Sequence, residues 1–393
     1  MSVGIRPYQQ RGERDHVLRW SAVVLLWAGL CAPSAVLALS KPDWLYTVAL
    51  PVTEQTEQAR EEAATRGLLE VLSRVTGLQS IPRGELVRAA LARPDRFYNQ
   101  FVFNQERDQQ NRRRLVVEIT YQSQAVLELV RAARLPVWDA RRPQLLALLV
   151  VEAPQGERTL LYEGSTHPLA TAVREVARAR GLPLRLPSAD GEAALDARDV
   201  WRYNTTVMRA AATRYAPDAI LIGRAQSRDD AAGASRLLVD WRYALSTLWL
   251  GQRGLRAPQV ITDMDADVAW VDEAQFQLPG QLATAQAAAS APIHTLANQL
   301  AERYAVLARD QQQHQIAITG VEDVQAYADL LAFLQALEFV DAARIEGLRG
   351  AAIEITLVSR AQSDQLLQLL TLGGELALPD SPLLGRIEFT WQG

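Results

Sequence analysis

The sequence predicts a protein of mixed α+β and α/β class that is built from three small units. Some segments carry apolar residues at helical spacing, whereas others are short apolar runs or alternations that are typical of strands. The two kinds of segment alternate along the chain, which indicates sheets covered by helices. Of the 393 residues, 49% are hydrophobic. This content is sufficient for a packed core in each unit.

The first unit, predicted over residues 44–143, has the order strand, helix, short helix, hairpin, helix. Thr53 is expected to cap the long helix, because apolar residues recur at helical spacing after it. Gly77 is expected to end that helix, since glycine accepts the left-handed backbone of a helix C-terminus. The predicted strands are 44–52, 97–104 and 114–121, and the predicted helices are 54–76, 85–92 and 123–134.

The central unit is predicted over residues 144–310 as a mixed sheet covered by helices. Residues 145–152 form a continuous apolar run, which is expected of a strand buried on both faces. The predicted order is similar to that of the TolB N-terminal and curli-secretion types of envelope domain. Further strands are predicted at 182–186, 218–223, 236–245 and 266–271, and helices at 168–180, 206–215 and 287–309.

The last unit, residues 314–393, is predicted to repeat the strand, helix, hairpin, helix order of the first. The phrase Val-Glu-Ile-Thr at 117–120 precedes the last helix of the first unit, and Ile-Glu-Ile-Thr at 353–356 precedes that of the third. Both end units are therefore expected to be small α+β units of the same type. The strands are predicted at 315–319, 339–345 and 352–358, with a turn at 347–350, and the helices at 321–337 and 362–370.

Residues 1–38 are predicted to be a secretory signal peptide. A basic lead precedes an uncharged apolar run from Trp20 to Ala38, and small residues precede the expected cleavage after Ala38. The run also approaches the length of a membrane span, so an uncleaved anchor is one alternative. Lipidation at Cys31 is another. Cleavage predicts a periplasmic protein with no membrane span in the mature chain.

Residue counts restrict the chemistry of the mature chain. Cys31 is the only cysteine and Lys41 the only lysine, so cleavage leaves no thiol and one terminal lysine. The formal net charge is −4, which argues against nucleic acid as a partner. The three histidines of the mature chain, His167, His294 and His314, are scattered and form no zinc pattern. We therefore predict no metal and no cofactor.

Two segments resemble a known family. One is the helix that ends in Arg74-Val-Thr-Gly77, and the other is the phrase Pro136-Val-Trp138 followed by Arg142-Pro143. Both are similar to motifs of DUF2066, an uncharacterised family of exported proteins from Gram-negative bacteria, over residues 44–152. Ala147 departs from the family, which has tryptophan there. The resemblance implies a cell-envelope protein and no particular reaction.

The signature Pro136, Trp138, Arg141, Arg142 and Pro143 lies between the first two units. In a functional interpretation, Trp138 anchors a partner and the arginines bind a carboxylate or phosphate. In a structural interpretation, the prolines stiffen a linker, Trp138 packs between units, and the arginines pair with acids or carbonyls. The structural interpretation is favoured.

The sequence offers no catalytic motif such as a nucleophile elbow, so no catalytic residue is predicted. The alternating acids Asp263, Asp265 and Asp267 are interpreted as a charged strand edge, and the aromatic segment 97–103 as packing between a sheet and its helix. We predict a non-enzymatic binding or assembly module that contacts other envelope proteins. The alternatives are a periplasmic hydrolase or cell-wall-fragment binding protein with a site assembled between domains, and a membrane-anchored scaffold with an uncleaved leader.

Overall fold

The computed structural model describes residues 43–107, 112–189, 195–215, 217–229, 235–245, 276–278, 283–307, 310–372, 374–379 and 387–393. The predicted leader 1–38, its cleavage after Ala38 and the lipidation alternative at Cys31 lie outside these residues. The same is true of the predicted strand 266–271 and the three alternating acids. Lys41–Gly393 forms one compact body, and within its described residues each of the three predicted units contains one sheet. Among the described helices, none combines the length and the apolar character that a membrane span requires.

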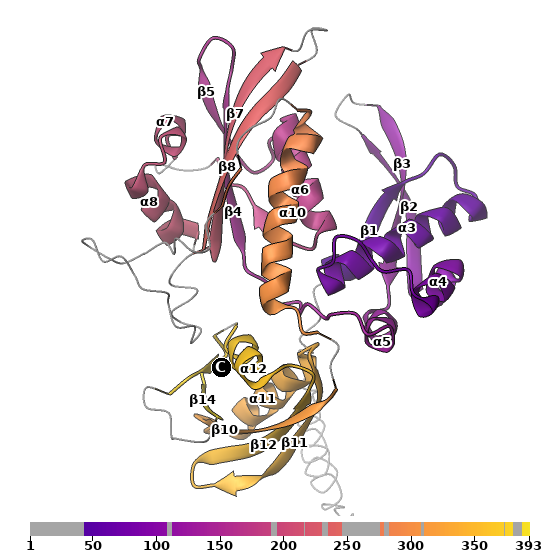
Figure 1. The fold of residues 1–393 in the computed structure, drawn as a ribbon, viewed down its shortest axis with the longest axis vertical. Helices are drawn as coiled ribbons and strands as arrows, with labels where there is room; N and C mark the ends of the chain where they lie inside the picture. The colour runs from indigo at the N-terminus through magenta and orange to yellow at the C-terminus, as the bar shows by residue number, and fades with distance from the viewer. Residues whose placement is uncertain are drawn as a thin grey trace, which may run out of the picture. The chain divides into compact units, whose positions relative to one another are not determined.

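The first sheet is antiparallel, with strand order β1-β3-β2 (Figure 1). One core joins it to the long helix α3, the short helix α4 and the final helix α5. Thr56, and not the expected Thr53, caps α3, because its hydroxyl accepts from Ala59 N at 3.3 Å. Gly77 ends α3 as predicted, with φ +73°. The elements are α2 Asp43–Tyr46, β1 Thr47–Pro51, α3 Glu57–Thr76, α4 Glu85–Ala92, the 3-10 turn η1 Pro94–Arg96, β2 Tyr98–Arg107, β3 Arg113–Tyr121 and α5 Ser123–Ala132.

The prediction of a strand from residue 44 is wrong for its first three residues, which belong to the helical turn α2. The buried guanidinium of Arg74 explains the turn. Its NH1 lies 2.8 Å from Trp44 O, 3.4 Å from Leu45 O and 2.9 Å from Thr47 O. A turn gathers these carbonyls around one cation, whereas an extended strand directs successive carbonyls to opposite sides.

The central sheet is mixed, with the order β5-β4-β7-β8-β9 and β6 beside β4. β4 pairs parallel with β7, and β7 antiparallel with β8. Alternate residues of β4 enter two cores, one beneath α6 and α10 and one beneath α7 and α8, which explains its continuous apolar run (Figure 1). The elements are β4 Leu145–Glu152, β5 Arg158–Leu161, α6 Pro168–Ala179, β6 Leu184–Arg185, α7 Ala197–Trp201, α8 Thr205–Tyr215, β7 Ala219–Asp229, β8 Ser235–Leu245, β9 Phe276–Leu278 and α10 Ala285–Tyr304.

The third sheet has the order β11-β12-β10-β14-β13. His314, which directly precedes the predicted strand 315–319, lies buried in β10, with Nε2 3.1 Å from Ala361 O. The predicted turn at 347–350 is also shifted, since β11 continues to Arg349 and Gly350 makes the turn at φ +64°. The elements are β10 Gln312–Thr319, α11 Val324–Ala336, β11 Val340–Arg349, β12 Ala352–Ser359, α12 Ser363–Leu370, β13 Leu376–Ala377 and β14 Ile387–Trp391.

The two end sheets share a strand arrangement. In the first, β1 pairs antiparallel with β3, which continues the β2–β3 hairpin. In the third, β10 pairs antiparallel with β12, which continues the β11–β12 hairpin. The two similar four-residue phrases lie in the middle strands β3 and β12. The structure therefore agrees with the predicted similarity of the two units, although β13 and β14 extend the third sheet beyond it.

Candidate binding groove at the junction of the three sheets

The two connections between the sheets pair with each other. Val137 lies in the connection from the first sheet to the second, and Val306 lies in the connection from the second to the third. Val137 N donates to Val306 O at 2.8 Å, and Val306 N donates to Val137 O at 2.7 Å. This short bridge brings parts of all three units together at one junction.

Arg142 joins the first and second units from inside the junction. Its Nε donates to Asp139 O at 3.1 Å, and its NH1 donates to Gly181 O at 2.6 Å. Its NH2 donates to Arg74 O at 2.6 Å and to Trp138 O at 3.1 Å. Burial lowers the pKa of Arg142 to about 10, while Glu338, Tyr46 and Asp139 oppose that shift. The guanidinium is therefore still a cation at neutral pH, and all three of its nitrogens already donate to backbone carbonyls.

Trp138 is fully buried beside this arginine. The Arg142 Cζ atom lies 4.1 Å from the indole centroid, within the range of a cation–π interaction. The backbone N of Trp138 donates to Val75 O at 2.7 Å. Gly77 must lack a side chain here, because a Cβ would meet Ala301 and would lie 3.0 Å from Trp138 Cε3.

Arg141 and Asp139 connect the junction to the third sheet. Asp139 Oδ1 pairs with Arg141 Nε at 3.0 Å, and Asp139 Oδ2 accepts from Glu338 N at 3.1 Å. Arg141 NH2 donates to Leu369 O at 3.0 Å. Tyr46 of the first unit donates to Glu338 Oε1 at 2.7 Å. Burial and the charge of Glu338 raise the pKa of the Tyr46 hydroxyl far above its ordinary value, so this donor keeps its proton.

The structure places the five signature residues at different depths of the junction. Trp138, Arg142 and Pro143 are buried, Arg141 is partly exposed, and Pro136 is partly exposed at the wall of a groove. Trp138 and Arg142 are in contact, whereas Arg141 turns toward the third sheet. The segment thus contacts all three units.

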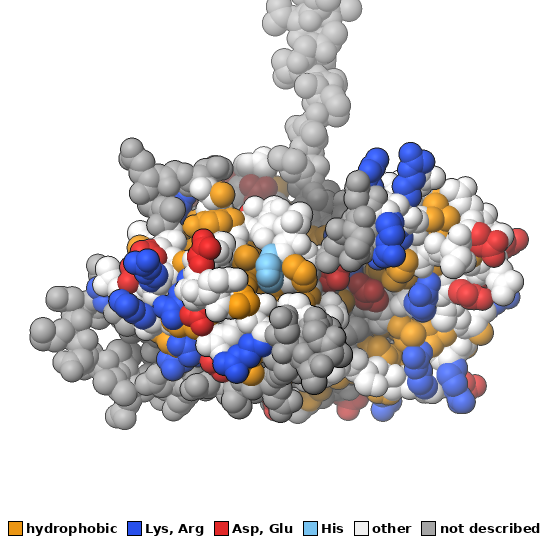
Figure 2. Space-filling view, turned by 90° about the horizontal axis from the view of Figure 1, so that it is seen from above, with side chains coloured by type: hydrophobic (Ala, Val, Ile, Leu, Met, Phe, Trp, Pro, Cys, Tyr) orange, Lys and Arg blue, Asp and Glu red, His pale blue; other side chains and the backbone are white. Residues whose placement is uncertain are grey.

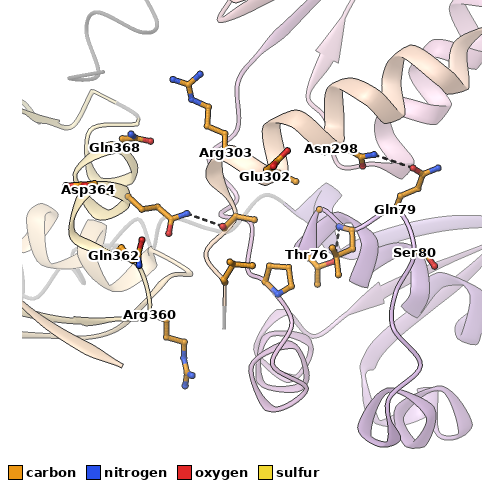
Figure 3. A pocket seen from close by; sticks show the side chains of 17 residues that line it. Thr76, Gln79, Ser80, Asn298, Glu302, Arg303, Arg360, Gln362, Asp364 and Gln368 are labelled. Atoms are coloured by element: carbon orange, nitrogen blue, oxygen red, sulfur yellow. Dashed lines mark hydrogen bonds between the residues drawn. The ribbon is translucent and has the colours of Figure 1, made fainter. Parts of the chain in front are cut away.

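A groove of about 700 Å³ opens at this junction. Figure 3 shows that its walls come from separate parts of the chain: the end of α3 and the loop after it, the second half of α10, and the start of α12. Five carboxamide side chains line it, those of Gln79, Asn298, Gln362, Gln365 and Gln368.

The charges around the groove balance. Arg303 and Arg360 carry two positive charges, and Glu302 and Asp364 carry two negative charges. Leu307 adds an apolar side chain that is 53% exposed.

Each carboxamide has two N–H donors and one acceptor oxygen. Some of these groups are already used within the protein: Asn298 Nδ2 donates to Gln79 Oε1 at 3.5 Å, and Gln365 Nε2 donates to Ala305 O at 3.1 Å. A groove with these properties suits an uncharged ligand that also donates and accepts hydrogen bonds.

The amino-acid sequence does not predict this groove. Gln362, Gln365 and Gln368 recur every three residues from the N-cap of α12 onward, but no motif or spacing joins them to Gln79 or Asn298. Only Pro136 belonged to the predicted signature. The site is therefore created by the packing of the three units.

Arg180 supports the α10 wall of the groove from behind. Its NH2 donates to Gly77 O at 2.8 Å and to Asn298 Oδ1 at 2.9 Å, and its NH1 lies 3.0 Å from His294 Nδ1. Burial lowers the pKa of Arg180 to about 10. Burial and then the charge of Arg180 lower the pKa of His294 below 6.5. A neutral His294 can accept from Arg180, whereas a protonated one cannot.

His294 is expected to contribute to the pH dependence of stability. Because its folded pKa is depressed, the unfolded state binds the proton more readily, and stability falls as the pH drops below 6.5. We expect the melting temperature to fall less between pH 7.5 and pH 5.5 (about two units of pH) in His294→Gln than in the unsubstituted chain. His167, whose pKa burial also lowers, is present in both proteins. Equal falls in melting temperature would contradict the prediction.

The three described histidines lie in different elements of the fold. His167 caps α6 by accepting from Leu169 N at 3.2 Å, His294 lies on α10, and His314 lies in β10. Across the described residues, no group of three or more His, Cys, Asp or Glu side chains has an arrangement that could hold a metal ion. On the face seen in Figure 2, arginines are interspersed with acidic and hydrophobic side chains.

A family described as a domain of unknown function (DUF8605) matches residues 41–139. The matched part is the first unit up to Asp139 in the junction segment. The chain matches no curated protein and no solved structure. The resemblance to DUF2066 covers a similar part of the chain and stays a prediction.

Proposed function

We propose that this protein is a non-enzymatic binding protein of the cell envelope, which holds an extended, uncharged segment of a partner protein in the junction groove. The observation that carries the proposal is the set of five carboxamides around one open groove of about 700 Å³. An extended peptide presents an N–H and a C=O at each residue. Carboxamides can pair with both groups, and Leu307 can contact an apolar side chain of the peptide.

The groove is also held in one shape, which favours binding. Arg142, Arg180 and the Val137–Val306 bridge fix its walls through buried hydrogen bonds. A site that is already ordered loses less conformational entropy when a ligand binds. The predicted leader would direct the protein to the envelope, where such a segment would belong to another exported protein.

A second candidate is the binding of a cell-wall fragment. The specific observation in its favour is that the groove is assembled from all three units. Sugar hydroxyls, like peptide amides, donate and accept hydrogen bonds with carboxamides. The experiment must therefore identify the chemical nature of the ligand.

Site-specific photo-crosslinking in intact cells tests the proposal. The photoreactive residue is placed at Gln79 on one wall or Gln362 on another, both exposed. Val324, which is 83% exposed on α11, is the control position. We expect both groove positions to give an adduct with the same protein, and Val324 to give none of it. An adduct that a muramidase releases would support the cell-wall candidate, and the absence of a common adduct would contradict the proposal.

A substitution in the groove should abolish that adduct. Leu307→Asp places a charge where the proposed ligand is uncharged, and its desolvation costs about 1–3 kcal/mol. This corresponds to a loss of affinity of about 5-fold to 150-fold. Since Leu307 is exposed, the melting temperature should stay the same. Retention of the adducts in folded Leu307→Asp would contradict binding in the groove.

A further inference from the structure

β2 has a free edge. Among the described strands it pairs only with β3, and eight of its ten residues are exposed. Two of the exposed side chains are apolar: Phe101 is 38% exposed and Val102 is 43% exposed. An edge strand of this kind presents unpaired N–H and C=O groups to other chains.

The equivalent edge of the third sheet is protected. β11 occupies the same place in its hairpin as β2, but its register with β12 shifts at two points. It also carries the charged residues Arg344, Glu346 and Arg349. Bulges and charges are the usual features that prevent pairing between edges. β2 has a single shift at its start, and its register with β3 is then regular from Gln100 to Arg107.

The sequence of β2 is chemically symmetric about Val102. Residues 99–105 read Asn-Gln-Phe-Val-Phe-Asn-Gln, without a charge, a proline or a glycine. Read in either direction from Val102, the order is aromatic, amide, amide. We propose that β2 pairs antiparallel with β2 of a second copy of this chain, across a two-fold axis at Val102. An isologous interface requires this kind of self-complementary surface.

The proposed register places aromatic side chains opposite each other on one face of the sheet and carboxamide side chains opposite each other on the other face. Phe101 and Phe103 lie opposite Ile119 and Val117 of β3, on the face that packs against the core. In the dimer, Phe101 of each copy lies opposite Phe103 of the other, which is a favourable aromatic cross-strand pair. Gln100 lies opposite Asn104 on the other face. A register shifted by one residue would place Phe101 opposite Asn104, so that neither the aromatic pair nor the carboxamide pair could form.

The charged end of β2 is also compatible with this register. Glu106 would lie opposite Tyr98 of the second copy, so no like charges meet across the axis. The two first sheets would form one continuous sheet with α3 of each copy on the same face. Arg60 of α3, whose Cζ lies 4.7 Å from the Phe101 centroid, would then cover the new aromatic pair.

Sedimentation velocity over a concentration series tests the pairing. We expect a monomer–dimer equilibrium in the unsubstituted chain, and a dissociation constant raised about tenfold or more in Val102→Lys, because two ammonium groups would meet at the axis. Ile345→Lys is the matched control, since Ile345 is a 39% exposed β-branched residue on β11, and it should dimerise normally. A chain that stays monomeric, or equal dimerisation in Val102→Lys, would overturn the proposal.

Disulfide trapping tests the register. In a Cys31→Ser background, Val102→Cys places one thiol beside its own symmetry mate, where opposed Cα atoms are about 4.5–5.5 Å apart. A disulfide spans that distance, so we expect a covalent dimer under mild oxidation. Ile345→Cys should stay monomeric on a non-reducing gel. If Val102→Cys gives no covalent dimer, or Ile345→Cys gives as much, the β2 pairing is wrong.

Discussion

Replacing Arg142 with alanine is expected to lower the free energy of unfolding by about 3–5 kcal/mol, the usual cost of removing one partner from a buried charged network. The guanidinium donates to the carbonyls of Arg74, Trp138, Asp139 and Gly181. Without it, these buried acceptors lose their donor, and each such group carries a desolvation penalty. Urea denaturation followed by circular dichroism measures the change.

Two further variants test whether the loss of stability depends on the position of Arg142 or follows from the loss of any arginine. Arg349→Ala removes an exposed arginine that pairs with Glu354 at 3.0 Å, and its effect should be below about 1 kcal/mol. Arg142→Lys keeps the charge but lacks the planar fork that reaches several carbonyls at once, so it should be destabilised as well. If Arg142→Ala unfolds at the same urea concentration as Arg349→Ala, the network does not hold the junction.

The parts of the fold that the sequence predicts are those in which local pattern and tertiary environment agree. The strand β4 and the helix α4 have the predicted bounds. A continuous apolar run fits a strand that is buried on both faces, and apolar residues at helical spacing fit a helix that buries one face. Gly77 ends α3 as expected, since its left-handed backbone is a local requirement. These features depend on a few neighbouring residues.

The parts that the sequence does not predict depend on distant contacts. α2 forms because Arg74 gathers the carbonyls of Trp44 and Leu45 from nearly thirty residues away. The sequence does not predict β14, because its parallel partner β10 lies about seventy residues earlier in the chain. The groove likewise exists only once α3, α10 and α12 are packed together. Periodicity within a short window contains none of this information.

The arginines of the junction illustrate why a motif can have two interpretations. As residue types, Arg141 and Arg142 suit a carboxylate or a phosphate. In the structure, Arg142 donates only to backbone carbonyls, and Arg141 pairs with Asp139 and with Leu369 O. These partners are those of the structural interpretation. The binding chemistry that we propose therefore belongs to the carboxamides around the junction, and the arginines hold the walls that carry them.

The first and third units have a similar hairpin topology but differ at the hairpin edge. β2 and β11 occupy equivalent edges, yet β11 carries charges and two register shifts, whereas β2 has neither over residues 100–105. If both edges had only to avoid association, both would be expected to have protection. The difference between two otherwise similar units is thus an internal comparison that favours a partner for β2.

Replacing Trp138 with alanine is expected to lower the free energy of unfolding by about 3–5 kcal/mol, as for other fully buried aromatic side chains. The change leaves a cavity between α3 and α10 and removes the ring beneath Arg142. A lower melting temperature should be accompanied by faster hydrogen exchange of the Val137 and Val306 amides, which bridge the two connections.

Trp138→Phe is the matched variant, because it keeps an aromatic face for Arg142 and part of the volume. It should lie between the alanine variant and the unsubstituted chain in both measurements. An unchanged melting curve in Trp138→Ala would mean that Trp138 does not hold the units together. A lower melting temperature with unchanged exchange at Val137 and Val306 would place the lost stability outside the bridge. If exchange at those two amides is instead faster in Trp138→Phe than in the unsubstituted chain, and fastest in Trp138→Ala, then packing of the Trp138 side chain stabilises the bridge between the two connections and, with it, the walls of the groove.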